Sequence, residues 1–171
     1  INRKKLWLKL IEWKIPWGLL KRIIQLHENA WTKVSLGQSG SLTARIDTPN
    51  GLRQGCILAP ILFSLFIADA LLAIQKVRAF PPKLGEAIMS AIFYADDTVL
   101  LDRTPIGLQR QLEAFATYCQ INYLIINTTK TQVMVFSRPN NKFSFTNWFI
   151  EGCRLEVTRN YRYLGVLFTD S

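Results

Sequence analysis

The sequence of 171 residues is poor in the side chains that most often build metal and redox sites. It has one histidine, His27, and three cysteines, Cys56, Cys119 and Cys153, with no Cys-x-x-Cys pair. A single histidine without a partner makes no metal or catalytic set, so we expect a capping or surface role for His27. The odd number and wide spacing of the cysteines argue against a zinc or redox site, and we expect reduced core residues of an intracellular protein.

The sequence also lacks an uninterrupted apolar run of membrane-spanning length. Residues 56–68 carry no charge, but Pro60 lies within this run and Asp69 ends it, short of the roughly 20 residues that a spanning helix needs. We therefore expect a buried helix over residues 58–77 and no membrane partner. No methionine opens the chain, and residues 1–5 lack the apolar core of a signal peptide, so we expect an internal piece of a longer protein.

Acidic residues are scarce relative to basic ones. The 12 Asp and Glu residues stand against 21 Lys and Arg residues, which gives a net charge of +9. This imbalance favours a polyanionic partner such as nucleic acid or an anionic membrane surface. With 49% hydrophobic and 19% charged residues, and with no internal repeat, low-complexity tract or linker, we expect one continuous domain over residues 1–171 with a sizeable core.

Apolar residues recur at helical spacing in three segments outside the apolar run. The pattern predicts helices over residues 2–14, 17–28 and 105–118. Pro16 separates the first two, because proline biases the residue before it away from helical backbone. Pro105 suits the first turn of the third helix, where its missing N–H costs no hydrogen bond.

A hairpin is predicted between the second helix and the apolar run. The segments 31–36 and 42–47 have strand-like composition, and residues 37–40 between them favour a four-residue turn. Lys33 and Arg45 would then lie on exposed strand positions.

Residues 88–101 are the most informative stretch for function. Two short runs rich in Ile, Phe, Tyr, Val and Leu flank one polar break, Asp96 and Asp97, and predict two strands buried on both faces. Adjacent carboxylates in an apolar hairpin repel each other and lose hydration, and a divalent metal is the strongest candidate to compensate for this. The alternative is an ordinary solvated turn, because aspartate is a good turn former.

Residues 51–56 place a long cation and an amide, Arg53 and Gln54, between two glycines just ahead of the predicted helix 58–77. Glycine permits close backbone approach to a ligand, and the helix N-terminus beyond it favours anions. The alternative is an ordinary glycine-rich loop that leads into a helix.

These two motifs together resemble a known family. Tyr94-Ala95-Asp96-Asp97 resembles the catalytic hairpin of reverse transcriptases, and alanine at its second place resembles non-LTR retrotransposon and group II intron enzymes. Residues 51–63, Gly-Leu-Arg-Gln-Gly-Cys-Ile-Leu-Ala-Pro-Ile-Leu-Phe, resemble the loop and helix that precede this hairpin in the non-LTR enzymes. The motifs occur in the family's order, and the resemblance covers residues 6–168.

The resemblance implies an α/β (α+β) fold, the reverse transcriptase palm, in which an antiparallel sheet with the catalytic hairpin packs on helices. The domain would be incomplete, with the start of the fingers and the thumb missing. The implied function is that of an RNA-directed DNA polymerase fragment, with magnesium as the cofactor, two ions in the intact enzyme. The implied partners are an RNA template, a DNA primer and deoxynucleotide triphosphates, and the implied location is nuclear or cytoplasmic.

The resemblance also implies roles for individual residues. Asp96 and Asp97 would be catalytic metal ligands. Lys130, which precedes a predicted strand at residues 133–136, would protonate the pyrophosphate leaving group. The residues implied to contact nucleic acid or nucleotide are Arg53, Gln54, Gly55, Tyr94, Leu164 and Gly165, the last two in a hairpin at residues 161–166 that holds the primer end.

One part of the family pattern is missing from the sequence. Successive strand side chains point to opposite faces, which makes it hard for Asp96 and Asp97 alone to bind both ions symmetrically. The family supplies a further aspartate from a strand ending in Phe-Asp, which by the resemblance would lie just before Ile1. Two hypotheses follow: the palm core of an RNA-directed DNA polymerase, or a non-catalytic remnant that binds nucleic acid.

Overall fold

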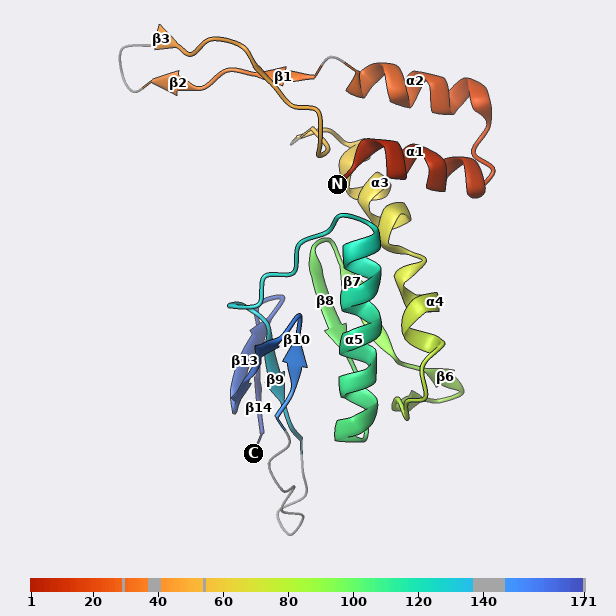
Figure 1. Cartoon of the computed structure of the whole chain (residues 1–171), viewed down its shortest axis with the longest axis vertical. Coiled ribbons are helices and arrows are strands. Elements are labelled where there is room, and N and C mark those ends of the chain that lie inside the picture. The colour runs from red at the N-terminus through yellow and green to blue at the C-terminus, as the bar shows by residue number, and fades with distance from the viewer. Residues whose placement is uncertain (29, 37–40, 54, 137–146, 171) are drawn as a thin grey trace. The chain divides into compact units, whose positions relative to one another are not determined.

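A computed structural model describes the chain except for residues 29, 37–40, 54, 137–146 and 171 (Figure 1). The chain forms two compact units, which we describe separately. The first contains Ile1–Asp69 and Phe93–Asp97, and the second contains Ala70–Ile92 and Thr98–Ser171. Helices and small two-stranded sheets occur along the described chain, which is consistent with the α+β class.

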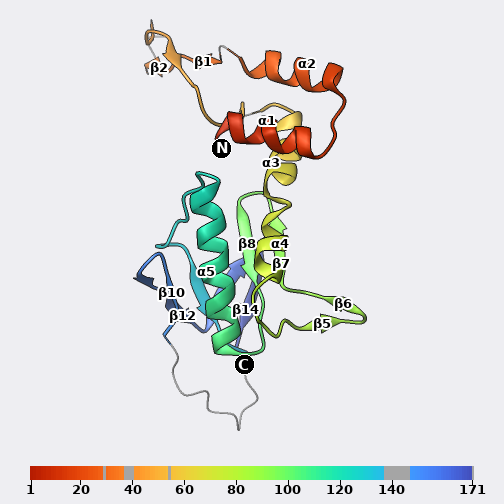
Figure 2. The same ribbon diagram turned by 45° about the vertical axis from the view of Figure 1, so that its right-hand side comes forward.

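Three helices form the body of the first unit: α1 (Arg3–Glu12), α2 (Trp17–His27) and α3 (Leu58–Ile67). The side chain of Asn2 caps α1 by accepting a hydrogen bond from the N–H of Lys5 at 3.1 Å. Helix α1 packs against both α2 and α3, and it runs beside α2 in both views (Figures 1 and 2). The helices predicted over residues 2–14 and 17–28 are therefore confirmed. The buried residues of the three helices include Leu6, Leu10, Leu20, Ile23, Leu62 and Phe66.

A two-stranded arm follows α2. Strand β1 (Trp31–Thr32) pairs with β4 (Ile46–Asp47), and β2 (Ser35–Leu36) pairs with β3 (Ser41–Leu42), all antiparallel (Figure 1). This confirms the predicted hairpin, although its turn, residues 37–40, lies outside the described residues.

Lys33 and Arg45 are exposed on this arm, as expected, but both lie just outside the paired strand residues. Their cationic groups are 5.7 and 5.6 Å from the centre of the Trp31 ring. These distances are within the range of cation–π attraction, so the two cations and the indole stabilise the arm locally.

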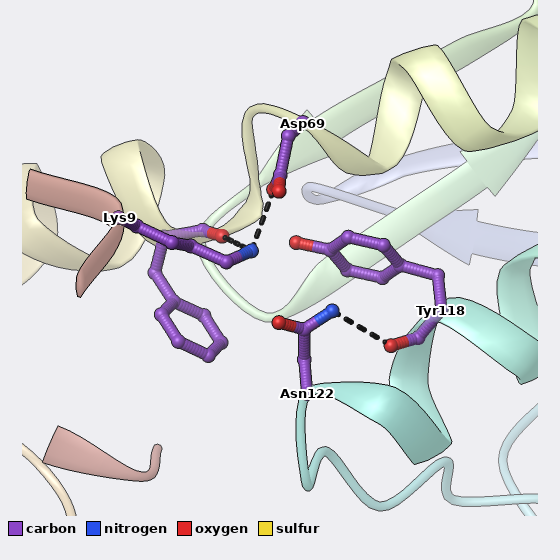
Figure 3. A network of polar contacts seen from close by, with 5 residues as sticks. Lys9, Asp69, Tyr118 and Asn122 are labelled. Atoms are coloured by element: carbon purple, nitrogen blue, oxygen red, sulfur yellow. Dashed lines mark hydrogen bonds and ion pairs between the residues drawn. The ribbon is translucent and has the colours of Figure 1, made fainter. Parts of the chain in front are cut away.

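The continuous helix predicted over residues 58–77 is wrong, because the chain turns at Ala68 and Asp69 between α3 and α4 (Ala70–Gln75). Figure 3 shows the reason on the side of the first unit: Lys9 Nζ donates to Asp69 Oδ1 at 2.6 Å and to the Phe66 carbonyl at 2.8 Å. Carbonyls at a helix end have no intrahelical donor, and here a buried lysine supplies one. The ion pair fixes the carboxylate that interrupts the apolar run.

The apolar residues Leu58–Gln75 are sufficient in length and composition to cross a membrane. Core helices of soluble proteins meet the same criteria, so composition alone does not decide between the two. Helices α3 and α4 bury only part of their apolar surface, which corrects the expectation of a buried helix. Their exposed apolar residues include Ile61 and Leu72, and their buried ones are Leu62, Phe66, Ile67, Ala70 and Ile74.

Helix α5 (Pro105–Ile121) is the longest element of the second unit and confirms the predicted helix 105–118. Thr104 caps it by accepting from the N–H of Gly107 at 3.1 Å, and Pro105 lies in the first turn. At its other end Asn122 donates from its side chain to the Tyr118 carbonyl at 2.9 Å (Figure 3). Helix α5 packs against α4.

The second unit also contains four pairs of short strands. They comprise β5 (Lys83–Leu84) with β6 (Ala87–Ile88), β10 (Phe149–Ile150) with β11 (Cys153–Arg154), β13 (Asn160–Tyr163) with β14 (Val166–Thr169), and β9 (Gln132–Met134) with β12 (Glu156–Thr158). The β9–β12 pair is parallel, which differs from the expected antiparallel sheet. Parallel pairing needs a long connection, and residues between β9 and β12 provide one. A core cluster joins α5 to these strands through Leu112, Ala116, Val133, Trp148, Ile150 and Leu155.

The central hairpin consists of β7 (Ala91–Tyr94) and β8 (Asp97–Leu100). The two strands are confirmed, but the expectation that both faces are buried is wrong. Residues alternate between half-buried and exposed along β7, and those of β8 are exposed at Asp97 and half-buried beyond it. These strands pair only with each other among the described residues, and a two-stranded sheet has no neighbours to cover both faces. Leu100 at the end of β8 packs against the core cluster.

Two expectations about rare residues also need correction. His27 is fully buried, which excludes the surface role but not the capping role. Its ring lies at the end of α2 against Trp7, with the ring centres 5.7 Å apart, and its Nδ1 lies 2.9 Å from the Ile23 carbonyl. Of the three cysteines, Cys119 is buried, Cys56 is half-buried and Cys153 is exposed, and all are free thiols. Cys153 lies in a short outer strand, where it cannot be a core residue.

Candidate catalytic hairpin and nucleic-acid interface

The tip of the central hairpin is a tight two-residue turn. Strand β7 ends at Tyr94, β8 begins at Asp97, and Ala95 and Asp96 form the turn between them. Ala95 has a φ of 49°, a left-handed backbone conformation that residues other than glycine rarely adopt. The turn therefore places the carboxylates of the adjacent residues Asp96 and Asp97 at the end of the hairpin, where Tyr94 also lies.

Asp96 and Asp97 are both exposed, and neither carboxylate has a hydrogen-bond or ion-pair partner within the described part of the chain. Desolvation is therefore not a reason for these carboxylates to need a metal, which corrects that step of the sequence argument. Their exposure leaves the oxygen atoms accessible to a ligand from solvent. The side chain of Tyr94 is also exposed, by 60%.

The donor set fits a hard divalent cation in part. Magnesium takes oxygen ligands and is commonly held by one or two carboxylates, with water and substrate phosphates completing the shell. Asp96 and Asp97 provide two such carboxylates. Within the described residues, no group of three His, Cys, Asp or Glu side chains gathers to hold a metal ion. The pair can thus contribute to a magnesium site but does not complete one.

The loop before α3 carries the second predicted site. Arg53 and Gly55 are exposed, and Gly55 has a φ of 78°, a conformation that favours glycine. Gln54 lies outside the described residues. Helix α3 begins at Leu58 without a side-chain cap, so the loop leads directly to backbone N–H groups at a helix N-terminus.

This loop lines a pocket of about 240 Å³ together with the end of α2. The lining residues are Leu26, His27, Arg53, Gly55 and Cys56. The pocket gives the loop a small concave surface. Sequence reasoning missed His27 here, because nothing in the spacing of His27 and Arg53 indicates that they meet.

Arg3, on α1, connects the two sides of this pocket through hydrogen bonds. Its Nε donates to the Gly51 carbonyl at 2.8 Å and its guanidinium donates to the His27 carbonyl at 2.9 Å. Burial lowers the pKa of Arg3 from its ordinary value. One side chain thus positions the start of the glycine loop and the end of α2.

Lys130 lies in a turn of the second unit, two residues before β9. Its N–H donates to the Asn127 side chain at 3.2 Å and to the Asn127 carbonyl at 3.1 Å, and its side chain is exposed. An asparagine that bonds the backbone two or three residues on is a common turn device. The turn leaves the ammonium group accessible to solvent, which the predicted role requires.

Leu164 and Gly165 form the turn of the β13–β14 hairpin. Their φ values are 48° and 83°, and positive φ at both central residues is the mark of a type I′ turn. The side chain of Leu164 is exposed by 51%. The turn therefore projects an apolar side chain into solvent at a strained position.

The predicted residues fall into the two units. The first unit brings Tyr94, Asp96 and Asp97 together at one hairpin tip, and it holds Arg53 and Gly55 in the loop at the pocket. The second unit carries the remaining candidates in two separate turns, Lys130 in one and Leu164 with Gly165 in the other.

Comparison with known proteins gives similar proteins in mobile elements of insects. A retrovirus-related Pol polyprotein from a type-2 retrotransposable element of Drosophila melanogaster is 32% identical over 165 residues, covering 90% of this chain and 15% of that protein. One from a type-1 element of Popillia japonica is 24% identical, covering 90% and 26%. An RNA-directed DNA polymerase from the mobile element jockey of Drosophila funebris is 27% identical, covering 90% and 17%. The chain thus spans 15% to 26% of the length of these relatives.

The family described as "Reverse transcriptase (RNA-dependent DNA polymerase)" matches residues 1–168. The match contains both the glycine loop and the Tyr94-Ala95-Asp96-Asp97 hairpin, the two motifs that carried the resemblance. The resemblance to the reverse transcriptases of non-LTR retrotransposons is confirmed. The chain belongs to the reverse transcriptase family.

Proposed function

We propose that this chain supplies the palm region of an RNA-directed DNA polymerase, which copies an RNA template onto a DNA primer from deoxynucleotide triphosphates. The observation that carries the proposal is the pair of exposed, unpartnered carboxylates, Asp96 and Asp97, at a tight hairpin tip. The family match supports it. That match and the retrotransposon relatives do not favour a non-catalytic remnant.

In this proposal Asp96 and Asp97 hold the divalent metal, which we take to be magnesium, with two ions in the intact enzyme. When bound, the metal supplies Lewis-acid stabilisation of the phosphate oxygens and lowers the pKa of the primer hydroxyl. Further oxygen ligands are needed, because Asp96 and Asp97 do not complete a metal site among the described residues. Tyr94, beside the carboxylates, contacts the nucleotide at the hairpin tip.

The other candidates bind and orient the substrates. Arg53 and Gly55, with Gln54 between them, contact template and incoming nucleotide, because a guanidinium binds phosphate in a bidentate manner and glycine allows close approach. Lys130 donates a proton to the pyrophosphate leaving group. Leu164 and Gly165 contact the primer end through their projecting turn.

The proposal also assigns a structural role to the apolar segment Leu58–Gln75 and a cellular location to the protein. We take Leu58–Gln75 as core helices of the polymerase rather than a membrane span, since Asp69 and its ion pair with Lys9 interrupt the segment. Their exposed apolar side chains would then be covered by further parts of the parent protein. We also propose a nuclear or cytoplasmic location, where an RNA template would be accessible.

Primer extension in the parent protein tests the catalytic assignment. Asp96→Asn removes one charge and keeps nearly the same shape, so we expect magnesium-dependent nucleotide incorporation to fall at least about 10²-fold, as it does when one electrostatic group of a transition state is removed. Glu86→Gln is the matched control, because Glu86 is an exposed acid in the β5–β6 turn. Its variant should keep normal incorporation.

The isolated chain provides the second arm of the test. It should show no magnesium-dependent extension, because its described residues hold no complete metal site and the chain spans only 15% to 26% of the length of its relatives. Normal extension by the Asp96→Asn parent protein, or extension by the isolated chain, would contradict the assignment of the catalytic carboxylates.

A further inference from the structure

The arm that follows α2 carries an exposed indole with two cations over its ring. The side chain of Trp31 is 51% exposed, although tryptophan is highly buried on average in folded proteins. Lys33 Nζ and the guanidinium carbon of Arg45 lie 5.7 and 5.6 Å from the ring centre. The arm contributes no buried apolar side chain among the described residues, so this cluster does not serve a core.

The three side chains share one face of the arm. The arm is a single layer of two strands, and its strands pair only with one another in the described part of the chain (Figure 1). Trp31 and Lys33 are two residues apart on one strand, so their side chains point to the same face. Arg45 joins them, because it is two residues from Asp47, which pairs with Trp31. We call the surface of Trp31, Lys33 and Arg45 the arm face.

A β-bulge in the arm helps to bring both cations to the indole. Between the two pairs of strands, residues 43–45 on the returning strand lie opposite only residues 33 and 34. One extra residue on one strand bends that strand and re-aims its side chains. Lys33 and Arg45 both lie in this segment, so the backbone of the arm sets their arrangement in part.

Both cations keep donors for a ligand. Lys33 has no ion-pair partner among the residues that the structure describes. Arg45 donates from Nε to Asp47 Oδ1 at 2.9 Å, which leaves the two terminal nitrogens of its guanidinium without a partner in the same part of the chain. A cation–π contact at an exposed site is weaker than a charge-assisted hydrogen bond. The two cations can therefore exchange the ring for a phosphate.

The chemistry of the arm face favours a single nucleic-acid strand as its occupant. An aromatic ring flanked by cations is suited to single strands, because a base stacks on the ring while the cations bind phosphates. A duplex does not offer this contact, since its bases stack on one another. A protein that covered the face would bury Lys33, and lysine is depleted in protein interfaces. Among the partners in the proposed function, the template ahead of the primer is the strand with unpaired bases.

We propose that the arm face binds the single-stranded RNA template, with one base stacked on Trp31 and neighbouring phosphates bound by Lys33 and Arg45. This inference rests on the proposed function. It assigns a contact to the arm, which lies outside both the glycine loop and the catalytic hairpin. Stacking does not depend on the identity of the base, so this contact holds the template without selecting its sequence.

Binding of labelled strands to the full 171-residue chain, followed by fluorescence anisotropy, tests the proposal. An RNA strand that cannot pair with itself is compared with a strand of the same length built from stable abasic residues. The abasic strand keeps the phosphates but has no bases. Trp31→Leu should weaken binding of the intact RNA about 5- to 100-fold, as for the loss of one stacked base. It should leave the affinity for the abasic strand nearly unchanged.

Three further variants serve as controls. Trp17→Leu removes an indole of α2 that is 66% exposed and has no cation over its ring within the described residues, so it should change neither affinity. Trp31→Phe keeps an aromatic ring and should recover most of the affinity for intact RNA. Lys33→Gln removes a phosphate contact, which both strands offer, and should weaken both by the same factor. Circular dichroism melting reports whether each variant folds.

Two results would overturn the inference and leave the proposed polymerase function intact. The first is a Trp31→Leu variant that binds intact RNA as tightly as the unmodified chain does, or that weakens intact and abasic strands equally. The second is equal affinity of the unmodified chain for intact and abasic strands, which decides the matter whether or not the Trp31→Leu variant folds. Binding of no strand would overturn the inference and would count against the proposed function as well.

Two further measurements test the choice of occupant. A DNA strand of the same sequence should lose as much affinity as RNA in Trp31→Leu, because stacking does not require the 2′-hydroxyl. A loss confined to the DNA strand would assign the arm face to DNA and overturn the assignment to the template. Sedimentation reports self-association of the chain. Self-association that Trp31→Leu abolishes, with RNA binding unchanged, would assign the face to a second copy of the chain and overturn the proposal.

Discussion

The carboxylate of Asp102 is held by several hydrogen bonds within the fold. Its carboxylate accepts from the N–H of Phe80 at 2.7 Å, from the N–H of Thr104 at 2.8 Å and from the Thr104 hydroxyl at 2.7 Å. These donors fix it at the start of α5 and link residues 22 positions apart. A carboxylate so engaged is a structural anchor, in contrast to Asp96 and Asp97, which have no such partners among the described residues.

Gly107→Ala should destabilise the protein through this carboxylate. A Cβ at residue 107 would overlap the Asp102 side chain, which cannot move without losing its hydrogen bonds to the backbone. We expect a loss of about 1–3 kcal/mol in the free energy of unfolding, measured by urea denaturation. Gly18→Ala in α2 is the control, because a Cβ there meets no atom within 4 Å. It should stabilise by about 0.5–1 kcal/mol, and equal effects of the two variants would contradict the packing argument.

Cys119 should be much less reactive than Cys153. Burial, with the charge of Glu151 as a smaller cause, raises the pKa of the Cys119 thiol to about 11. The reactive form is the thiolate, so at pH 8 a maleimide should label exposed Cys153 first and Cys119 only as the protein unfolds. Mass spectrometry of a labelling time course locates the adducts. Equal labelling rates in the folded protein would refute the assignment.

The same raised pKa has a consequence for stability. The Cys119 pKa in the folded protein exceeds the ordinary value of 9.0, so above that value the unfolded chain loses its proton first and is favoured. Stability from this group is therefore present below about pH 9 and declines as the pH rises toward about 11. The decline should be smaller in a Cys119→Ala variant and unchanged in Cys153→Ala.

At the scale of elements, local signals predicted most helices correctly. Pro16 and Pro105 mark helix ends because proline restricts the backbone, and apolar residues recur at helical spacing, so α1, α2 and α5 could be predicted from sequence. The break between α3 and α4 could not, because it depends on Lys9, 60 residues from Asp69 along the chain. The parallel pairing of β9 with β12 is non-local in the same way.

The candidate site also has local features that the sequence could predict and features that depend on the fold. The hairpin at Asp96 and the loop at Arg53 are contiguous in sequence, so their motifs were visible through the family resemblance. The exposure of the two carboxylates was not, because apolar flanking strands indicate burial only when other layers cover them. His27 was missed because it meets the glycine loop only through the fold.

Substitution of Leu164 tests whether the backbone strain in the β13–β14 turn is retained for function. A leucine with a φ of 48° at a type I′ position costs roughly 1–2 kcal/mol relative to right-handed backbone. Leu164→Asn should therefore raise the free energy of unfolding by up to about 1 kcal/mol, since asparagine suits this position. If Leu164 contacts the primer as proposed, the same change in the parent protein should weaken primer binding.

The neighbouring glycine provides the control for the turn. Gly165→Ala places a side chain at a φ of 83°, so it should destabilise the hairpin by about 1 kcal/mol or more. Thermal melting followed by circular dichroism measures both variants. A Leu164→Asn variant that is less stable than the original chain would show that leucine packing, rather than backbone strain, dominates this turn.

At the scale of the whole molecule, the net charge of +9 should govern nucleic-acid affinity. Exposed cations lie in both units, among them Lys33, Arg45, Arg53 and Lys130. Cations that neutralise phosphates release counterions from the strand, so the affinity depends on the salt concentration. The logarithm of the association constant for single-stranded RNA should therefore fall linearly with the logarithm of salt concentration.

The slope of this dependence counts the phosphate contacts and tests Arg53 individually. Each contact contributes about −0.7 to the slope for single strands, so Arg53→Gln should make the slope less negative by about that amount. Lys83→Gln is the matched control, because Lys83 is an exposed cation in the β5–β6 hairpin to which no role is assigned. It should leave the slope unchanged. Affinity independent of salt would exclude phosphate contacts as the main source of binding, and equal slopes for the two variants would mean that Arg53 contributes only general charge.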